Sequence, residues 1–299
     1  MIHQADFLGT RRHPRARLRA LIEKDAPVLV PGAFDALSAR LVQEAGFDAV
    51  YMTGFGTAAS LLGRPDVGLA TATEMTDNAR RIAACVDLPV IADADTGYGN
   101  PLNVIRTVRD YETAGVAAIQ LEDQVAPKRC GHMAGKEVVS AAEMIAKIEA
   151  ADAARTDPDL LIIARTDAIA VHGIDEAIDR AHRYAGAGAD LLFVEAPTTV
   201  EEIRRVAGEL REHRLVFNWV EGGRSPALPR EELADLGFAL ILFPIGGLLA
   251  ATRAMREFYA TIRRDGTPTA ALDDLPAFDD FTAMMGLDEI TQLSERFGH

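Results

Sequence analysis

Cysteine is scarce in this chain, with only Cys85 and Cys130 among 299 residues. Two cysteines are too few for a disulfide framework, which favours a protein of a reducing compartment. Basic residues are also in deficit, because 31 lysines and arginines face 45 acidic residues and the formal net charge is −14. This balance argues against nucleic acid or an anionic membrane as the main partner.

Long apolar runs are missing too. No run reaches the roughly 18 residues of a membrane-spanning helix. The segment Met1–Arg19 is polar and arginine-rich, without the apolar centre of a signal peptide. We therefore expect a soluble, cytoplasmic protein. The chain does contain 48 % hydrophobic residues, enough for a large core, and its length suits one (β/α) barrel.

Short apolar runs, rich in β-branched residues, alternate with longer stretches of helical pattern. Several short runs are apolar throughout, as in parallel strands buried on both faces. The predicted strands are Val28–Val30, Ala49–Thr53, Val90–Asp93, Ala118–Glu122, Leu160–Arg165, Leu191–Glu195, Val216–Asn218 and Leu240–Phe243. The predicted helices between them are Asp35–Ala45, Glu74–Val86, Asn103–Ala114, Ser140–Ala154, Ile174–Ala187, Val200–Leu210 and Arg230–Leu236.

Eight strand–helix units predict a (β/α)8 TIM barrel. A doubly wound open sheet is the alternative, but the count of eight favours closure. The sequence shows no linker, so we expect one domain over residues 1–299, with a helical extension from about residue 250. In that extension Ala251–Arg263 and Phe278–Phe297 have helical patterns. The tail is longer than a bare barrel needs, so packing against a neighbouring subunit is one explanation for it.

Polar residues stand at the ends of the predicted strands, where active sites of this architecture lie. They are Tyr51, Thr53 and Gly54 at the second strand, Asp93 and Asp95 at the third, Glu122 at the fourth, Arg165 at the fifth, Glu195 at the sixth and Asn218 at the seventh. Their convergence on one end of the barrel is stronger evidence for a site than any single motif.

Asp93 and Asp95 are two residues apart on an extended segment, so both side chains point to one face. With Glu122 on the adjacent strand they make a carboxylate cluster, and a divalent cation relieves the repulsion. Few protein oxygens and an open site favour Mg²⁺ over Ca²⁺, and a calcium loop fails because its twelfth position is Val104. The alternative makes Asp95 a turn residue and Asp93 a helix cap.

Arg165 ends the fifth predicted strand, and its planar guanidinium suits a substrate carboxylate. The alternative is an ion pair with Glu195 or Asp167 that supports the barrel rim, and both roles can hold together.

Cys130 lies in the segment Lys128-Arg129-Cys130-Gly131-His132, shortly after the fourth predicted strand. Basic neighbours and a histidine lower the pKa of a thiol, and the glycine leaves the backbone mobile. The segment predicts a reactive cysteine, with a small residue in a surface loop as the alternative. Cys85 lies beside apolar residues in a predicted helix, and we interpret it as part of the core.

Gly54–Ala59 fits the dinucleotide-binding pattern G-x-G-x-x-A after a strand, and Glu74 stands about where the ribose-binding acid would be. The segment Ser60–Asp66 breaks before any long helix, and the pattern lies in the second unit instead of the first. Both points argue against a nucleotide site.

These segments resemble the isocitrate lyase/phosphoenolpyruvate mutase superfamily over nearly the whole chain. The matching segments are residues 31–36, 51–54, 93–99, 122–124, 127–132, 164–168 and 195–197. The Lys-Arg-Cys-Gly-His motif marks the carbon–carbon bond lyases of the superfamily. Its phosphonate mutases, its hydrolases and the related oxaloacetate decarboxylases lack the cysteine.

The resemblance implies Mg²⁺, with Mn²⁺ as a substitute, near Asp95, while Asp93 and Glu122 contribute partly through water. It implies that Lys128–His132 form a mobile loop that closes over substrate, and that Asp66 is an active-site acid. It also implies a C-terminal helix swapped between the subunits of a homotetramer, a dimer of dimers.

Within the superfamily the chain resembles the 2-methylisocitrate lyases and the 2-alkylmalate and 2,3-dimethylmalate lyases. Leu249 stands where the former have an arginine for a carboxylate, and Phe55 replaces a glycine. A lost cation and added bulk favour a smaller or more apolar substrate. The resemblance thus implies Mg²⁺-dependent retro-aldol cleavage of a small-molecule 2-hydroxy di- or tricarboxylate to an α-keto acid, such as pyruvate, and a carboxylic acid.

In that reaction Tyr51 is the expected base, Arg165 stabilises the departing enolate, and Cys130 protonates it. Lys128 and His132 are expected to tune the thiol and to bind carboxylates. The expected substrate-binding residues are Thr53, Gly54, Phe55, Asp66, Gly131, Arg165, Glu195 and Asn218. The alternatives are oxaloacetate decarboxylation, chemistry of the phosphonate or phosphoenolpyruvate mutase type, and a non-catalytic metabolite-binding barrel.

Overall fold

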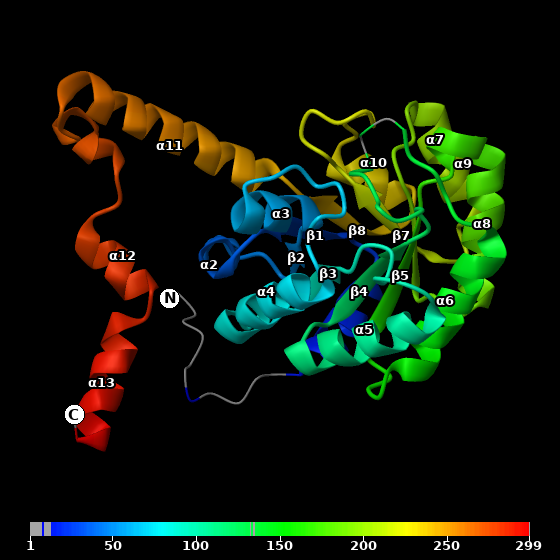
Figure 1. Cartoon of the computed structure of the whole chain (residues 1–299), viewed down its shortest axis with the longest axis horizontal. Helices are drawn as coiled ribbons and strands as arrows, with labels where there is room; N and C mark the ends of the chain where they lie inside the picture. Colours follow the sequence, from blue (N-terminus) through cyan, green and yellow to red (C-terminus); the bar gives the residue numbers. More distant parts are fainter. Residues whose placement is uncertain (1–7, 9–12, 132, 134, 299) are drawn as a thin grey trace. The chain divides into compact units, whose positions relative to one another are not determined.

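Eight parallel strands form a closed barrel in which each strand pairs with the next along the chain (Figure 1). The computed structural model describes Leu8, residues 13–131, Met133 and residues 135–298. The strands are β1 (Val28–Ala33), β2 (Val50–Met52), β3 (Val90–Asp93), β4 (Ala118–Glu122), β5 (Leu161–Thr166), β6 (Leu191–Val194), β7 (Arg214–Asn218) and β8 (Phe238–Phe243). Because β1 also pairs with β8, with Val28 opposite Leu240, the (β/α)8 barrel is confirmed and the open sheet is excluded.

The predicted strands are all present, and their ends differ from the prediction by at most three residues. The largest difference is at β1, which continues beyond Val30 through Pro31 and Gly32 to Ala33. A Cβ atom at Gly32 would lie 2.1 Å from the carbonyl oxygen of Pro244. The glycine therefore serves a close approach of two backbones at the barrel wall.

Helices surround the barrel and connect its strands (Figure 1). They are α1 (Pro14–Ile22), α2 (Ala36–Glu44), α3 (Gly54–Leu62), α4 (Ala72–Cys85), α5 (Pro101–Ala114), α6 (Ala141–Ala154), α7 (Ile169–His172), α8 (Ile174–Gly186), α9 (Val200–Glu209) and α10 (Arg230–Asp235). Side-chain caps set several starts: Asp35 accepts from the Ser38 amide at α2, and Asn100 accepts from the Asn103 amide at α5. α1, α3 and α7 fall outside the predicted helices.

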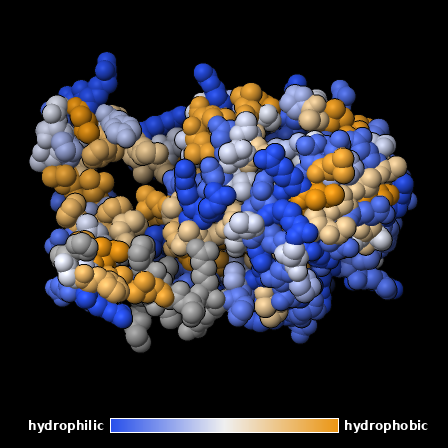
Figure 2. All heavy atoms as spheres, turned by 60° about the horizontal axis from the view of Figure 1, so that its bottom comes forward, coloured by the Kyte–Doolittle hydropathy of each residue, from blue (hydrophilic) through white to orange (hydrophobic). Residues whose placement is uncertain are grey.

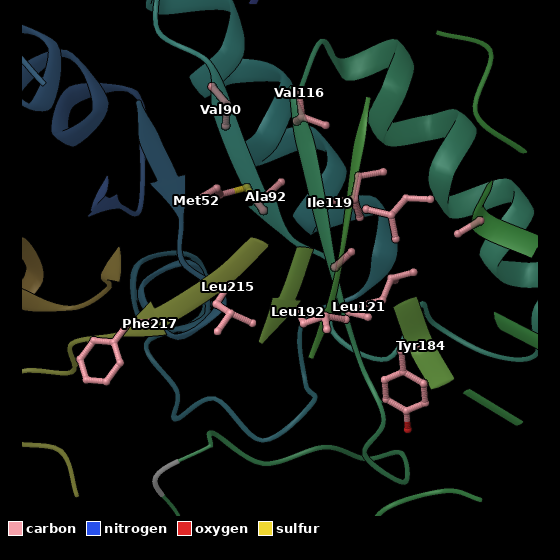
Figure 3. Packing of buried hydrophobic residues seen from close by; sticks show 14 of the residues in the cluster. Met52, Val90, Ala92, Val116, Ile119, Leu121, Tyr184, Leu192, Leu215 and Phe217 are labelled. Atoms are coloured by element: carbon pink, nitrogen blue, oxygen red, sulfur yellow. The ribbon is translucent and has the colours of Figure 1, made fainter. Parts of the chain in front are cut away.

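Two apolar layers fill the barrel unit. One lies between strands and helices and contains Met52, Ala92, Leu121 and Leu192, with Tyr184 contributed by α8 (Figure 3). The other fills the barrel interior, where Leu18, Leu21 and Ile22 of α1 pack with side chains of the strands. Helix α1 thus plugs the N-terminal end of the barrel with apolar groups. The polar side chains predicted for the site lie at the opposite end, where the strands finish.

Residues 248–298 belong to a second compact unit, separate from residues 13–247. It contains most of α11 (Gly246–Asp265), the 3₁₀ helix η1 (Thr269–Asp274), α12 (Phe278–Met284) and α13 (Leu287–Phe297), so the predicted C-terminal helices are present. Large apolar side chains are exposed on these helices, including Phe278, Leu287 and Phe297. Figure 2 colours the residues on one face of the molecule by hydropathy, with hydrophobic residues in orange. Among the residues that the structure describes, none of the helices combines the length and the apolar character needed to cross a membrane.

Candidate active site

The polar strand ends surround one cavity of about 240 Å³. Of the residues predicted for the site, Tyr51, Thr53, Phe55, Asp66, Asp93, Glu122, Lys128, Cys130, Gly131, Arg165, Glu195 and Asn218 line it. Gly54 does not line the cavity; its amide donates to Asp93 Oδ2 at 3.3 Å. Asp95 does not line the cavity but forms an ion pair with Lys128. His132 lies outside the described residues. The sequence analysis therefore predicts most of the residues that line this cavity.

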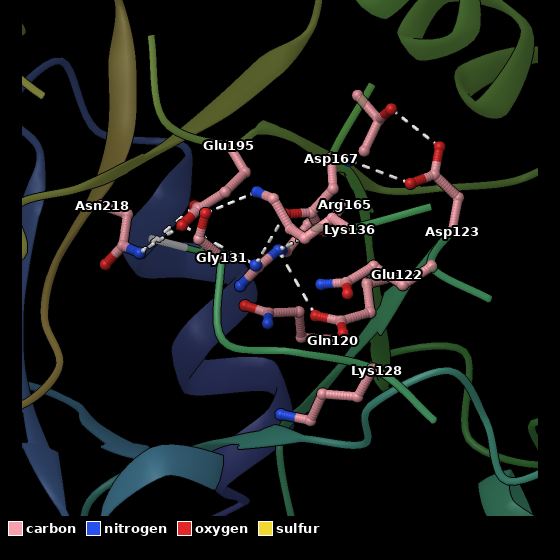
Figure 4. A network of polar contacts seen from close by, with 12 residues as sticks. Gln120, Glu122, Asp123, Lys128, Gly131, Lys136, Arg165, Asp167, Glu195 and Asn218 are labelled. Atoms are coloured by element: carbon pink, nitrogen blue, oxygen red, sulfur yellow. Dashed lines mark hydrogen bonds and ion pairs between the residues drawn. The ribbon is translucent and has the colours of Figure 1, made fainter. Parts of the chain in front are cut away.

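Arg165 is the central cation of the site and is almost fully buried (Figure 4). Its Nε and Nη2 donate to the two carboxylate oxygens of Asp167 at 2.9 and 3.1 Å. Glu122 Oε2 lies 3.4 Å from Nε, and Glu195 Oε1 lies 3.7 Å from Nη2. Burial alone would lower the pKa of Arg165, but Asp167 and Glu195 outweigh it and raise that pKa. These contacts hold the guanidinium in one orientation. The ion pairs with Asp167 and Glu195, which the sequence analysis gave as an alternative role for Arg165, are present.

Lys128 joins two acids from different segments. Its Nζ lies 2.6 Å from Asp66 Oδ2 and 2.7 Å from Asp95 Oδ1, and its side chain is only 4 % exposed. Burial alone would lower the pKa of Lys128, but Asp95 and Glu122 outweigh it and raise that pKa. The ammonium therefore stays charged and ties the segment after α3 to the end of β3.

The carboxylate cluster at the ends of β3 and β4 is deeply buried. Asp93 Oδ1 accepts from the Asp95 amide at 3.0 Å. Burial raises the pKa of Asp95 to about 7 and raises the pKa of Glu122 well above its ordinary range. Glu122 Oε1 has no hydrogen-bond partner among the described atoms. A bound cation would give the orphaned buried oxygen a partner and would favour the ionised form of these carboxylates.

These carboxylates do not form a closed metal cage. Within the described ranges, no group of three or more His, Cys, Asp or Glu side chains is arranged to hold a metal ion. Mg²⁺ usually keeps several waters and takes only one or two protein carboxylates directly. The residues present therefore fit a magnesium ion bound largely through water.

The cysteine segment contacts residues from several parts of the site. The Cys130 amide donates to the Asp66 carbonyl at 3.2 Å, and the Met133 amide donates back to the Cys130 carbonyl at 2.8 Å. Gly131 lies so close to the site that a Cβ atom there would be 2.2 Å from both Arg165 Nη2 and Glu195 Oε1. Only glycine allows this contact, so the turn carrying the thiol sits directly against the central cation.

Tyr51 lies on β2 and donates its hydroxyl to Gln120 Oε1 at 3.3 Å. Burial, with Asp93 adding to it, raises the pKa of Tyr51 well above its ordinary value. In this state the side chain is a neutral phenol. Gln120 is fully buried on β4, two residues before Glu122 and on the same face of the strand.

Several residues of the site fall outside the prediction. Lys136 and Gln120 contact predicted site residues. The unpredicted residues that line the cavity are Arg129, Met133, Val220, Glu221, Gly222, Gly223, Pro244 and Ile245. A polar residue inside an apolar strand marks Gln120, but no local pattern marks Lys136, whose partner Asp167 is 31 residues away. Glu74, the acid of the nucleotide pattern, instead forms a capping box with Thr71 at the start of α4.

Comparisons with known proteins agree with this geometry. A family model described as phosphoenolpyruvate phosphomutase matches residues 18–263. The 2,3-dimethylmalate lyase of Eubacterium barkeri is 48 % identical over 282 residues, covering 94 % of this chain and 97 % of the relative. The 2-methylisocitrate lyase of Salmonella typhimurium is 42 % identical over 261 residues, covering 87 % and 88 %.

Solved structures are similar as well. A 2,3-dimethylmalate lyase structure, described as a PEP mutase/isocitrate lyase superfamily member, superposes with a TM-score of 0.91 at 41 % identity, covering 97 % of each chain. A phosphonopyruvate hydrolase in complex with oxalate and Mg²⁺ superposes with a TM-score of 0.88 at 32 % identity, covering 96 % of this chain and 99 % of that one.

Proposed function

Because the chain belongs to the PEP mutase/isocitrate lyase superfamily and is an oxo-acid lyase, we propose that it cleaves a 2-hydroxy dicarboxylate of the 2-alkylmalate or 2,3-dimethylmalate type. The products are an α-keto acid such as pyruvate and a carboxylic acid. One observation carries this proposal: the Cys130 turn, the Arg165 guanidinium and buried carboxylates line the same cavity. A proton donor for carbon, a cation for carboxylates and oxygen ligands for Mg²⁺ therefore meet in one place.

The apolar part of the cavity lining indicates the rest of the substrate. Phe55, Val220, Pro244 and Ile245 line it, together with the acid Glu221. Glu221 accepts from the Ile245 amide at 3.2 Å, which fixes it in the wall. Among the described lining residues the only basic ones are Lys128, Arg129 and Arg165. An unpaired third carboxylate against an apolar wall costs several kcal/mol, which disfavours a tricarboxylate.

The tricarboxylate 2-methylisocitrate remains the second substrate class, because a 2-methylisocitrate lyase is among the relatives. Leu249 stands where the resemblance places an arginine in 2-methylisocitrate lyases, which argues against this substrate. It lies on α11 in the C-terminal unit. Its part in substrate choice stays a prediction.

The chain's own residues can bind and orient the substrate. Arg165 presents its guanidinium to a substrate carboxylate while Asp167 holds its other edge. Asn218 donates its amide to Glu195, and its buried Oδ1 has no partner among the described atoms, so it is available to a substrate hydroxyl. Asp95, Asp93 and Glu122 would hold Mg²⁺, with Mn²⁺ as a substitute. When bound, that ion polarises the hydroxyl and carboxylate oxygens that become the keto acid.

Proton movements follow from the placement of Tyr51 and Cys130. Tyr51 is the proposed base for the 2-hydroxyl proton; burial opposes the phenolate, while Arg165 and Lys128 favour it by lowering the pKa of Tyr51. As the carbon–carbon bond breaks, its electron pair moves to the departing half as an enolate and the hydroxyl carbon becomes the keto group. Arg165 stabilises the enolate, and the protonated thiol of Cys130 delivers a proton to its carbon.

Assembly into a homotetramer is part of the same proposal. Large apolar side chains are exposed on the C-terminal helices, including Phe278 and Phe297 at 79 % and 62 %. Exposed apolar clusters of this kind mark surfaces that another protein covers. Light scattering after size-exclusion chromatography should give a mass near four times 32.2 kDa, and a monomer would contradict this part.

The test of the activity follows keto-acid release from 2,3-dimethylmalate, 2-alkylmalates, 2-methylisocitrate, isocitrate, oxaloacetate and a phosphonate. Each substrate is assayed with Mg²⁺ and with EDTA, for the wild type and for Cys130→Ser. We expect turnover of the alkylated malates, loss of it in EDTA, and loss of it in Cys130→Ser. Turnover that survives EDTA, or full activity in Cys130→Ser, would overturn the mechanism. Exclusive turnover of oxaloacetate or the phosphonate would favour the other branches of the superfamily.

A further inference from the structure

Lys136 is a buried cation that has no part in the proposed chemistry (Figure 4). Its side chain is only 2 % exposed. Its Nζ donates to the Gly131 carbonyl at 2.5 Å and to Asp167 Oδ1 at 2.7 Å. Lys136 does not line the active-site cavity, whereas Gly131 and Arg165 do. Any influence of Lys136 on the reaction must therefore pass through these neighbours.

Asp167 is shared between Lys136 and the central cation Arg165. Burial alone would raise the pKa of Asp167, but Arg165 and Lys136 outweigh it and lower that pKa to about 2, so the carboxylate stays charged. Its backbone amide also donates to Asp123 Oδ1 at 2.9 Å.

Asp123 links this end of β5 to helix α8. It is fully buried, and its Oδ2 accepts from Thr166 at 2.7 Å, Tyr184 at 2.8 Å and Arg180 at 3.1 Å. Asp167 is therefore a fixed anchor, and a group bound to it is held relative to the barrel.

The other partner of Lys136 is the turn that carries the thiol. Gly131 touches Arg165 and Glu195 so closely that no side chain fits between them. A shift of the turn by about 1 Å would open or close that contact and move Cys130 with it. Errors of this size in a catalytic group cost on the order of 100-fold in rate.

We propose that Lys136 is a positioning residue that ties the Cys130–Gly131 turn to Asp167 and so holds the thiol at a fixed place beside Arg165. The proposal rests on the proposed function, because it concerns the delivery of a proton by Cys130. Asp167 binds both Lys136 and Arg165, so it holds the turn and the guanidinium in place relative to each other.

The test compares Lys136→Met, Lys136→Arg and Arg155→Met. Arg155 is the matched control, because it is also largely buried and ion-paired, to Asp190 at 2.6 Å, but lies at the other end of the barrel. Asp167 keeps Arg165 as a partner in Lys136→Met, so the fold should survive. The readouts are kcat and KM, and hydrogen exchange at the Cys130 amide without substrate.

A hydrogen bond to a charged group is worth about a 10- to 100-fold effect. We expect Lys136→Met to lower kcat by about that factor with little change in KM, and to speed exchange at the Cys130 amide. Lys136→Arg should recover most of both, and Arg155→Met should lower the unfolding midpoint and leave kcat and exchange unchanged. If Lys136→Met does not fold, Lys136→Gln, which keeps donors without the charge, takes its place.

Wild-type kcat in a folded Lys136→Met protein, or unchanged exchange at Cys130, would overturn the proposal. An equal loss of kcat in Lys136→Met and Arg155→Met would also overturn it, because it would reduce the role to stability. Absence of lyase activity in the wild type would refute the proposed function instead, while the exchange measurement would still test the anchor.

Discussion

Substitution of Gly131 by alanine should remove most of the activity and leave the fold intact. Gly131 has no left-handed backbone conformation, so alanine adds no backbone strain. The new Cβ atom would stand 2.2 Å from Arg165 Nη2 and from Glu195 Oε1, whereas ordinary van der Waals contact begins at 3.4 Å. The turn and these side chains must therefore separate by about 1 Å.

Neither neighbour can move freely. Arg165 Nη2 is bonded to Asp167, and Glu195 is bonded to Asn218, so yielding to the methyl group disturbs both pairs. A misplacement of about 1 Å lowers kcat on the order of 100-fold, equivalent to about 2.7 kcal/mol in the activation barrier. Gly131 belongs to a loop that lines the cavity, so the loop can yield into the cavity while the strands keep their places, and we expect only a small change in the free energy of unfolding.

Gly208→Ala is the matched control. Gly208 is exposed on α9 with no atom within 4 Å of an added Cβ, so alanine should stabilise the helix by about 0.5–1 kcal/mol without affecting turnover. The assay is the initial rate of pyruvate release, coupled to lactate dehydrogenase, beside thermal unfolding of each variant. A kcat/KM of Gly131→Ala within threefold of the wild type would refute the close contact between turn and cation.

Three further predictions test the charges of the site. Lys128→Met leaves Asp66 and Asp95 buried without their shared cation, so the free energy of unfolding in urea should fall by about 3–5 kcal/mol; adding Asp66→Asn should restore part of it. Asp167 has a pKa lowered to about 2, so its contribution to stability is present above pH 4 and lost as the pH falls through 2; in Asp167→Asn the acid-induced loss should shrink by about 2 kcal/mol. The pKa of Asp95 is raised to about 7 by burial, so the stability of the metal-free protein should fall as the pH rises toward 7 and Mg²⁺ should raise the unfolding midpoint more at pH 8 than at pH 6. A Mg²⁺ response that Asp95→Asn retains would contradict the last of these.

Much of the fold is visible in the sequence because the signals are local and repeated. Each buried strand is an apolar run, and the second to seventh runs end in polar residues that the topology must gather at one end of the barrel. Gly32 shows the limit of this reasoning. It lies beyond the predicted end of the first strand, and its role depends on Pro244, which is distant in sequence and adjacent only in the folded barrel.

The residues of the site likewise fall into those that a local motif predicts and those whose roles depend on distant contacts. Cys130, Arg165 and Asp93 are predicted from their motifs, and the structure places all three on one cavity. Lys136 and Ile245 are not predicted, because an isolated lysine or isoleucine carries no local pattern and their roles arise from contacts across the fold. The pairing of Lys128 with Asp66 is likewise a contact over 62 residues, which no spacing rule reports.

The central claim is a retro-aldol cleavage in which Cys130 protonates the departing carbon. The most direct measurement is turnover of 2,3-dimethylmalate in D₂O, with the products followed by proton NMR. The account predicts pyruvate together with a carboxylic acid that carries one deuteron at its α-carbon, and no products from Cys130→Ser. Cleavage without deuterium at that carbon, or the same labelled products at the wild-type rate from Cys130→Ser, would contradict it.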